Sequence, residues 1–113
     1  TAINIIAAYE TIKFGTGDGA AAAERAARYE RADLLIIDDM GTEMGTAFTV
    51  SALYNLINNR LMAHRPMIVN TNLPPEALSE KYSPAVASRL LGEFKQLRFF
   101  GDDIRMLKSR MQR

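Results

Sequence analysis

The feature that most constrains this fold is the aliphatic run Leu34–Ile37, which is followed directly by Asp38 and Asp39 and then by Gly41. An unbroken apolar run that ends in β-branched residues predicts a strand over residues 34–38, buried on both faces as in a parallel sheet. Open α/β sheets bind their ligands at the carboxyl ends of such strands, so we expect both carboxylates to lie at a ligand site. The alternative interpretation is an ordinary strand that ends in a polar turn.

Strands and helices alternate along the rest of the chain. Residues 1–14, 20–31 and 46–63 have helical character, Gly15–Gly19 has the composition of a linker, and two shorter helices are predicted to start near Pro74 and at Ser83. Apolar runs predict two further strands over residues 66–72 and 96–100. This spacing is the βαβ pattern of a parallel sheet. We therefore expect an α/β fold, namely a three-layer parallel sheet with flanking helices.

Composition excludes several classes of site. The chain of 113 residues has no cysteine, which excludes disulfides and thiolate metal sites and suits a cytoplasmic protein. The single histidine, His64, cannot build a zinc site alone. No stretch approaches the roughly 18 apolar residues of a membrane span, so we expect no membrane association. The net charge is only +1, but basic residues gather from Lys95 onward. A basic tail of this kind can contact nucleic acid or an acidic partner, or can remain a solvated terminus.

The acidic pair predicts metal-assisted phosphate chemistry. Two neighbouring carboxylates repel each other unless a cation or strong hydrogen-bond donors compensate. A phosphate-bound Mg²⁺ does this, with Asp38 supporting the metal, directly or through water, and Asp39 positioning an attacking water. That is the Walker B arrangement of nucleotide triphosphatases. Asp39 is one methylene shorter than the Glu more usual at this place, so we expect slow hydrolysis.

Three further polar residues are candidates for the same site. Asn72 follows the second predicted strand, where its amide could bond both a γ-phosphate oxygen and the water, and Asn70 competes for this role. The alternative is that both asparagines cap the next turn. Arg89 carries a planar, permanent charge that suits phosphate, and would be an arginine finger if presented to a neighbouring subunit. Its alternative is a surface ion pair with Glu93.

A phosphate-binding loop is missing from the sequence. That loop has the pattern G-x-x-x-x-G-K-S/T. None of the lysines in the chain follows a glycine, so the pattern is absent. The glycine-rich stretch Gly15–Gly19 follows a predicted helix instead of linking a strand to a helix, and it contains no lysine.

Five linked segments carry a family resemblance, and they cover nearly the whole chain in order: Ala32–Glu43, Asn59–Arg60, Ile68–Leu73, Ala87–Leu90 and Phe99–Arg105. With them the chain resembles the later portion of the ATPase domain of DnaC-type helicase loaders and of the related IstB-like transposition ATPases, both within the AAA+ class of P-loop NTPases. Residues 1–113 would then be the C-terminal part of an AAA+ ATPase domain, from the helices before Walker B onward.

The resemblance implies a role for each matching residue. Asp38 and Asp39 match Walker B, with Asp38 at the Mg²⁺, and Asn72 matches sensor I. Arg89 matches the arginine finger of the Ser-Arg-Leu segment, and Arg105 lies in a family Asp-Ile-Arg motif as a candidate nucleotide contact. The implied cofactors are ATP and Mg²⁺. The implied partners are a replicative helicase of the primosome or a transposase, single-stranded DNA, and further copies of the subunit.

The chain also departs from that family. There, a strand and the P-loop precede the position that Thr1 occupies, and the P-loop supplies most of the grip on the nucleotide. We therefore expect the chain neither to hold ATP tightly nor to hydrolyse it measurably. Loss of the P-loop strand would leave a gap in the sheet, which direct pairing of strands 66–72 and 96–100, or self-association, would close.

Two other classes of protein fit parts of the sequence. A non-catalytic oligomerisation or regulatory module derived from the same fold would keep the sheet and lose the chemistry. A phospho-receiver domain also places an acidic pair at a strand end. It needs another Asp at the end of the following strand, whereas this chain has Asn70, Thr71 and Asn72 there.

Overall fold

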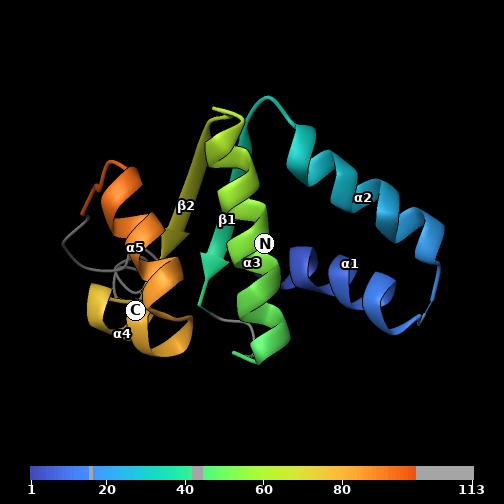
Figure 1. The fold of residues 1–113 in the computed structure, drawn as a ribbon, viewed down its shortest axis with the longest axis horizontal. Coiled ribbons are helices and arrows are strands. Elements are labelled where there is room, and N and C mark those ends of the chain that lie inside the picture. Colours follow the sequence, from blue (N-terminus) through green and yellow to red (C-terminus); the bar gives the residue numbers. More distant parts are fainter. Residues whose placement is uncertain (16, 42–44, 99–113) are drawn as a thin grey trace, which may run out of the picture.

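The computed structural model describes residues 1–15, 17–41 and 45–98. Within these residues the chain forms an α/β fold of helices around a two-stranded parallel sheet (Figure 1). The elements follow in the order α1 (Ala2–Phe14), α2 (Gly19–Arg31), β1 (Leu35–Met40), α3 (Ala47–Met62), β2 (Met67–Thr71), α4 (Pro75–Lys81) and α5 (Pro84–Glu93). The predicted α/β class is confirmed.

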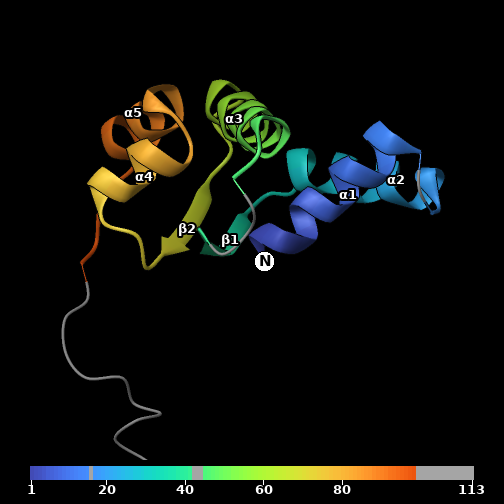
Figure 2. The same ribbon diagram turned by 90° about the horizontal axis from the view of Figure 1, so that it is seen from below.

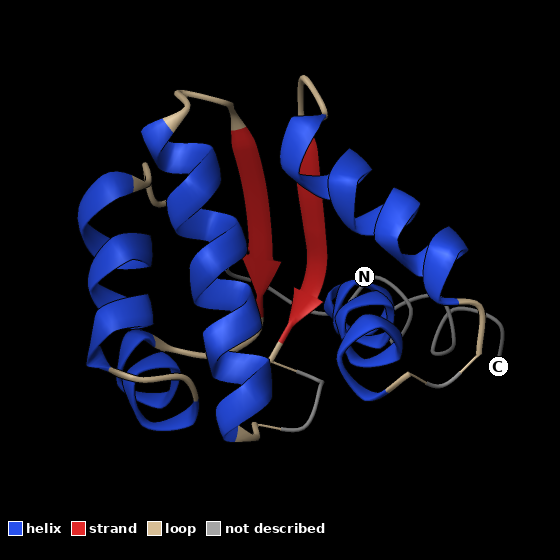
Figure 3. Cartoon of the chain, turned by 45° about the vertical axis from the view of Figure 1, so that its right-hand side comes forward, coloured by secondary structure: helices blue, strands red, loops and turns tan. Residues whose placement is uncertain are grey.

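The two strands run in the same direction, as the arrows in Figure 3 show. Leu35 pairs with Met67 and Ile37 with Val69, and the register shifts between Ile37 and Met40. The helix α3 makes the crossover that parallel neighbours require. The predicted parallel direction of the strands is therefore confirmed for β1 and β2.

The helices of the described residues cover one face of this sheet. α3, α4 and α5 lie on the same side of both strands, and α1 packs beside β1 (Figure 2). Ile37 points to the covered side and is 0% exposed, whereas Ile36 and Ile68 are 54% and 51% exposed. The prediction that β1 is buried on both faces is wrong, because no described helix lies over the side that Ile36 and Ile68 occupy.

The predicted third strand is not seen. Residues 96–98 belong to no strand, and residues 99 and 100 lie outside the described part of the chain. The sheet therefore has two strands in the described residues, and it does not form the expected three layers. No pairing of residues 96–98 with β2 closes the edge of the sheet.

Local signals fix most helix ends as predicted. The hydroxyls of Thr46 and Ser83 accept the backbone N–H groups of Thr49 and Val86, and so cap α3 and α5. Gly15 follows α1 with a left-handed φ of 69°, the conformation that glycine adopts most easily at a helix end. Of the described helices, α1, α3 and α5 thus begin where the sequence supplies a hydroxyl cap.

The core lies between the covered face of the sheet and the helices. Leu53, Leu56 and Ile57 of α3 are buried against Ile37 of β1 and Val86 of α5. Full burial of each such side chain stabilises the fold by about 1.5–3 kcal/mol. α1 adds Ala2, Ile5 and Ile6 to the same core. Among the described residues no helix is long and apolar enough to cross a membrane.

Candidate functional site

Polar side chains from both strands meet at their carboxyl ends. Asp38 and Asp39 lie in the second half of β1, and Asn70 lies in β2; all three are exposed. The backbone N–H of Asp39 donates to Oδ1 of Asn70 at 2.9 Å. The predicted strand 34–38 places the acidic pair at or after the strand end, whereas β1 continues through both residues to the buried Met40.

A local irregularity turns both carboxylates toward solvent. In a regular strand, side chains alternate between the two faces, so one of two neighbours would point toward the helices. Asp39 instead has a φ of 55°, in the left-handed region that Asp tolerates better than most residues. The register shift between Ile37 and Met40 falls at the same place. Irregularities of this kind redirect side chains and are over-represented beside functional sites.

The turn after β1 is held by contacts from two other segments. The Thr71 hydroxyl donates to the Met40 carbonyl at 2.5 Å and accepts the Leu73 N–H at 3.1 Å. Nζ of Lys81 donates to the Gly41 carbonyl at 2.6 Å. Gly41 has a φ of 112°, and a Cβ there would lie 2.7 Å from Cδ1 of Leu73. Position 41 therefore requires glycine for both its backbone and its space.

The two asparagines behave differently from each other and from the turn-capping alternative. Asn70 binds the backbone of Asp39 across the strands. Asn72 is exposed, and within the described residues its side chain has no hydrogen-bond partner. The Thr71 hydroxyl, not either asparagine, caps the turn at Leu73. Asn72 is thus the amide left available to a ligand at this end of the sheet.

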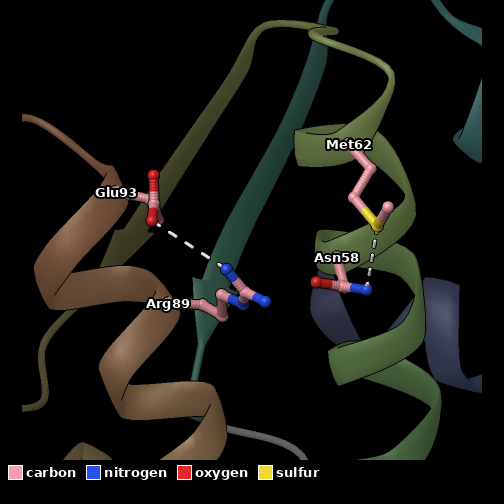
Figure 4. A network of polar contacts seen from close by, with 4 residues as sticks. All are labelled: Asn58, Met62, Arg89 and Glu93. Carbon is pink, nitrogen blue, oxygen red and sulfur yellow. Dashed lines mark hydrogen bonds and ion pairs between the residues drawn. The ribbon is translucent and has the colours of Figure 1, made fainter.

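Arg89 lies on α5 and pairs with Glu93 one turn later. The NH1 atom of Arg89 lies 3.9 Å from Oε1 of Glu93, and the two side chains are 40% and 55% exposed. Figure 4 shows this pair near α3, where Asn58 donates to the sulfur of Met62 at 3.7 Å. The surface ion pair considered from the sequence is confirmed, and nothing within the described chain joins Arg89 to the acidic pair. Arg105 lies outside the described residues.

The metal-binding capacity of the site is limited. Among the described residues, no group of three or more His, Cys, Asp and Glu side chains could hold a metal ion. Mg²⁺ commonly keeps several waters and takes only one or two protein carboxylates together with substrate phosphates. Two exposed carboxylates, Asp38 and Asp39, fit that second type of site and do not fit a cage made by protein ligands alone.

Sequence reasoning misses three residues around this strand pair. Lys81 stands out in the sequence only as a lysine without a preceding glycine, and Thr71 only as a strand residue. Arg60 falls near the end of its helix and within a family segment, but neither fact indicates a structural role. Each binds a backbone carbonyl far away in the sequence. No local pattern in the sequence signals contacts of this kind.

Comparisons of the chain with family models, with curated proteins and with solved structures found no match. The resemblance to helicase loaders therefore depends on the five sequence segments alone.

Proposed function

We propose that this chain is part of an AAA+ ATPase domain of the helicase-loader class, the part that carries the acidic strand and the polar strand beside it. One observation carries the proposal. Asp38 and Asp39 are exposed at the carboxyl end of a strand whose parallel neighbour presents Asn70 and Asn72 at the same end. This is the edge at which α/β sheets bind ligands. In this proposal β1 and β2 contribute two strands to the three-layer P-loop core of a complete domain.

Each side chain has a separate task in the proposed site. Asp38 would hold a Mg²⁺ ion through water, and Asp39 would accept a hydrogen bond from the attacking water. Asn72 would donate to a γ-phosphate oxygen. Asn70 would keep the Asp39 backbone in place, since its amide oxygen already accepts the Asp39 N–H. Bound ATP would supply the phosphoryl group, and the accompanying Mg²⁺ would neutralise part of the negative charge of the phosphates.

The proposed biological role follows the family resemblance. The subunit would help to load a replicative helicase onto single-stranded DNA in the cytoplasm, or would assist a transposase.

The 113 residues contain no G-x-x-x-x-G-K-S/T pattern. We therefore expect weak ATP binding by this chain alone, and a calorimetric titration with ATP and Mg²⁺ that gave a micromolar Kd would contradict that expectation.

A cation titration tests the site without requiring nucleotide. Mn²⁺, a paramagnetic substitute for Mg²⁺, should broaden the amide signals of residues 38–40 and 70–72 before all others in an NMR spectrum. Asp39→Asn should weaken this binding by about tenfold or more, because it removes one of only two carboxylates. Asp33→Asn is the matched control, since Asp33 is also exposed but precedes β1. Equal broadening around Asp33 and Glu93 would refute the site.

The second candidate function is a non-catalytic interaction module. The observation that favours it is the uncovered side of the sheet, where the register partners Ile36 and Ile68 are both about half exposed. Parallel sheets are nearly always covered on both faces. We expect self-association that Ile36→Lys abolishes, measured by size-exclusion chromatography with light scattering. A wild-type chain that stays monomeric at high concentration would exclude this function.

A further inference from the structure

Arg60 occupies an unusual position for a charged residue. It lies in the last turn of α3 and is 0% exposed. Its NH1 atom donates to the carbonyls of Tyr29 and Glu30 at 2.9 Å and 3.1 Å, and its NH2 atom donates to the carbonyl of Pro66 at 2.9 Å. Every one of these partners is a backbone carbonyl. No ion pair of Arg60 with a carboxylate occurs in the described residues.

These carbonyls belong to the segments that lead into the two strands. Tyr29 and Glu30 are in the last turn of α2, shortly before β1, and Pro66 immediately precedes β2. The Pro66 carbonyl also accepts the backbone N–H of Leu35, the first residue of β1, at 3.3 Å. In Figure 1 the end of α2, the end of α3 and the starts of both strands meet at the top of the molecule.

The surroundings explain how the buried charge is tolerated. Burial lowers the pKa of Arg60, and the nearby positive charge of Arg65 lowers it further. Carbonyls at the end of a helix carry partial negative charge, which favours a cation there. Arg65 adds a second bond to the Glu30 carbonyl, at 2.7 Å. The guanidinium thus exchanges hydrogen bonds with water for hydrogen bonds with three backbone carbonyls. This exchange is favourable only while the N–H donors stay aligned with those carbonyls.

We propose that Arg60 is a positioning residue of the candidate site: by bridging the starts of β1 and β2 it fixes their register, and so sets Asp39 opposite Asn70. A slip of one residue would turn every side chain of β1 to the other face and would remove the Asp39 N–H from Oδ1 of Asn70. The effect acts over roughly 13 Å along the strand, at about 3.3 Å per residue. The control of strand register by Arg60 does not depend on the proposed function. Only the statement that Arg60 positions a ligand site rests on the proposed function.

NMR spectroscopy of two variants tests the register directly. Arg60→Met removes all three carbonyl contacts, and Arg60→Lys keeps the charge but lacks the planar fork that reaches both segments. Arg65→Met is the matched control, because Arg65 binds Glu30 but not Pro66. The Asn70→Ala variant serves as a reference, because it gives the chemical shift of the Asp39 amide when its hydrogen-bond acceptor is absent. All spectra are recorded with trimethylamine N-oxide, which favours the folded state.

In both Arg60 variants we expect the intensity of the cross-strand NOE between Ile37 and Val69 to fall at least about fivefold. These two residues are register partners and therefore lie close together while the strands keep their register. The Asp39 amide of both Arg60 variants should move to the position seen in Asn70→Ala, while helix content by circular dichroism is retained. Arg65→Met should change neither signal. Unchanged signals in folded Arg60 variants, an equal loss in Arg65→Met, or complete unfolding of both Arg60 variants would each overturn the proposal. Because no metal or nucleotide is used, failure here is distinct from failure of the proposed function.

Discussion

At their starts, β1 and β2 are joined by a buried guanidinium that binds only backbone carbonyls, whereas at their carboxyl ends the exposed Asn70 side chain of β2 accepts the backbone N–H of Asp39 in β1. The first end has Arg60 sealed from solvent, and the second has Asp38, Asp39 and Asn72 open to it. We call the first the closed end and the second the open end. In our proposal the closed end sets the register of the two strands, and the open end presents its exposed polar groups to a ligand.

The largest predicted effect is at the closed end. Arg60→Met should lower the free energy of unfolding by roughly 3 kcal/mol, because it removes three charge-assisted hydrogen bonds to backbone carbonyls at once. Urea unfolding measures the change. Arg25→Met is the control, since Arg25 lies exposed on α2 and should cost less than about 0.5 kcal/mol. A loss below about 1 kcal/mol for Arg60→Met would erase the contrast between the two ends.

At the open end, the backbone of Gly41 should be the most sensitive position. Gly41→Ala should destabilise the fold by roughly 2 kcal/mol, because φ is 112° and the new Cβ would lie 2.7 Å from Leu73. Gly92→Ala is the matched control: it lies in α5, a Cβ added there would meet no atom within 4 Å, and it should stabilise by about 0.5–1 kcal/mol. The midpoint temperature of thermal unfolding should fall in Gly41→Ala and rise in Gly92→Ala. Shifts of the same sign would contradict the description of the turn.

The stability of the fold should also depend on pH through Tyr9, which lies beside the last turn of α2. Burial, the charge of Glu30 and the neighbouring Tyr29 raise the pKa of Tyr9 to about 12. The unfolded tyrosine has a pKa near 10, so above pH 10 the unfolded state binds fewer protons and stability falls until about pH 12. Between about pH 9 and pH 11 we expect a loss of roughly 1 kcal/mol that Tyr9→Phe lacks. Urea unfolding at several pH values measures the free energy of unfolding of the wild-type chain and of Tyr9→Phe. The same pH dependence in both proteins would contradict this prediction.

The smallest predicted effect separates the two asparagines. Asn70→Ala should cost about 1 kcal/mol, because the Asp39 N–H loses its acceptor. Asn72→Ala should leave stability unchanged within about 0.3 kcal/mol, since nothing in the described chain binds its side chain. Chemical denaturation of both variants checks the difference. Equal losses would mean that the open end is held by Asn72 as well.

Much of the fold follows from local patterns in the sequence. The apolar runs locate β1 and β2 to within two residues, and Ser83 and Gly15 mark helix ends correctly. The burial of β1 could not be read in the same way. An aliphatic run shows that a strand forms, but Ile36 lies on a face whose covering, if any, is not encoded in the run itself.

The candidate site was predictable only in its residue types. Asp38, Asp39 and the asparagines can be identified because they follow or end apolar runs. The Asp39 N–H binds Asn70, and the Thr71 hydroxyl binds the Met40 carbonyl, each across about 30 residues of sequence. Arg60 binds the carbonyls of Tyr29 and Glu30 across a similar separation. Such contacts arise from packing, and a single sequence gives no periodic signal for them.

The backbone of Asp39 also decides how its carboxylate should be probed. A φ of 55° strains alanine or glutamate at this position, so either replacement would mix a conformational penalty with the loss or displacement of charge. Asparagine keeps the side-chain shape and accepts the same dihedral angles. A neutral amide at position 39 is therefore the substitution whose outcome reports on charge alone.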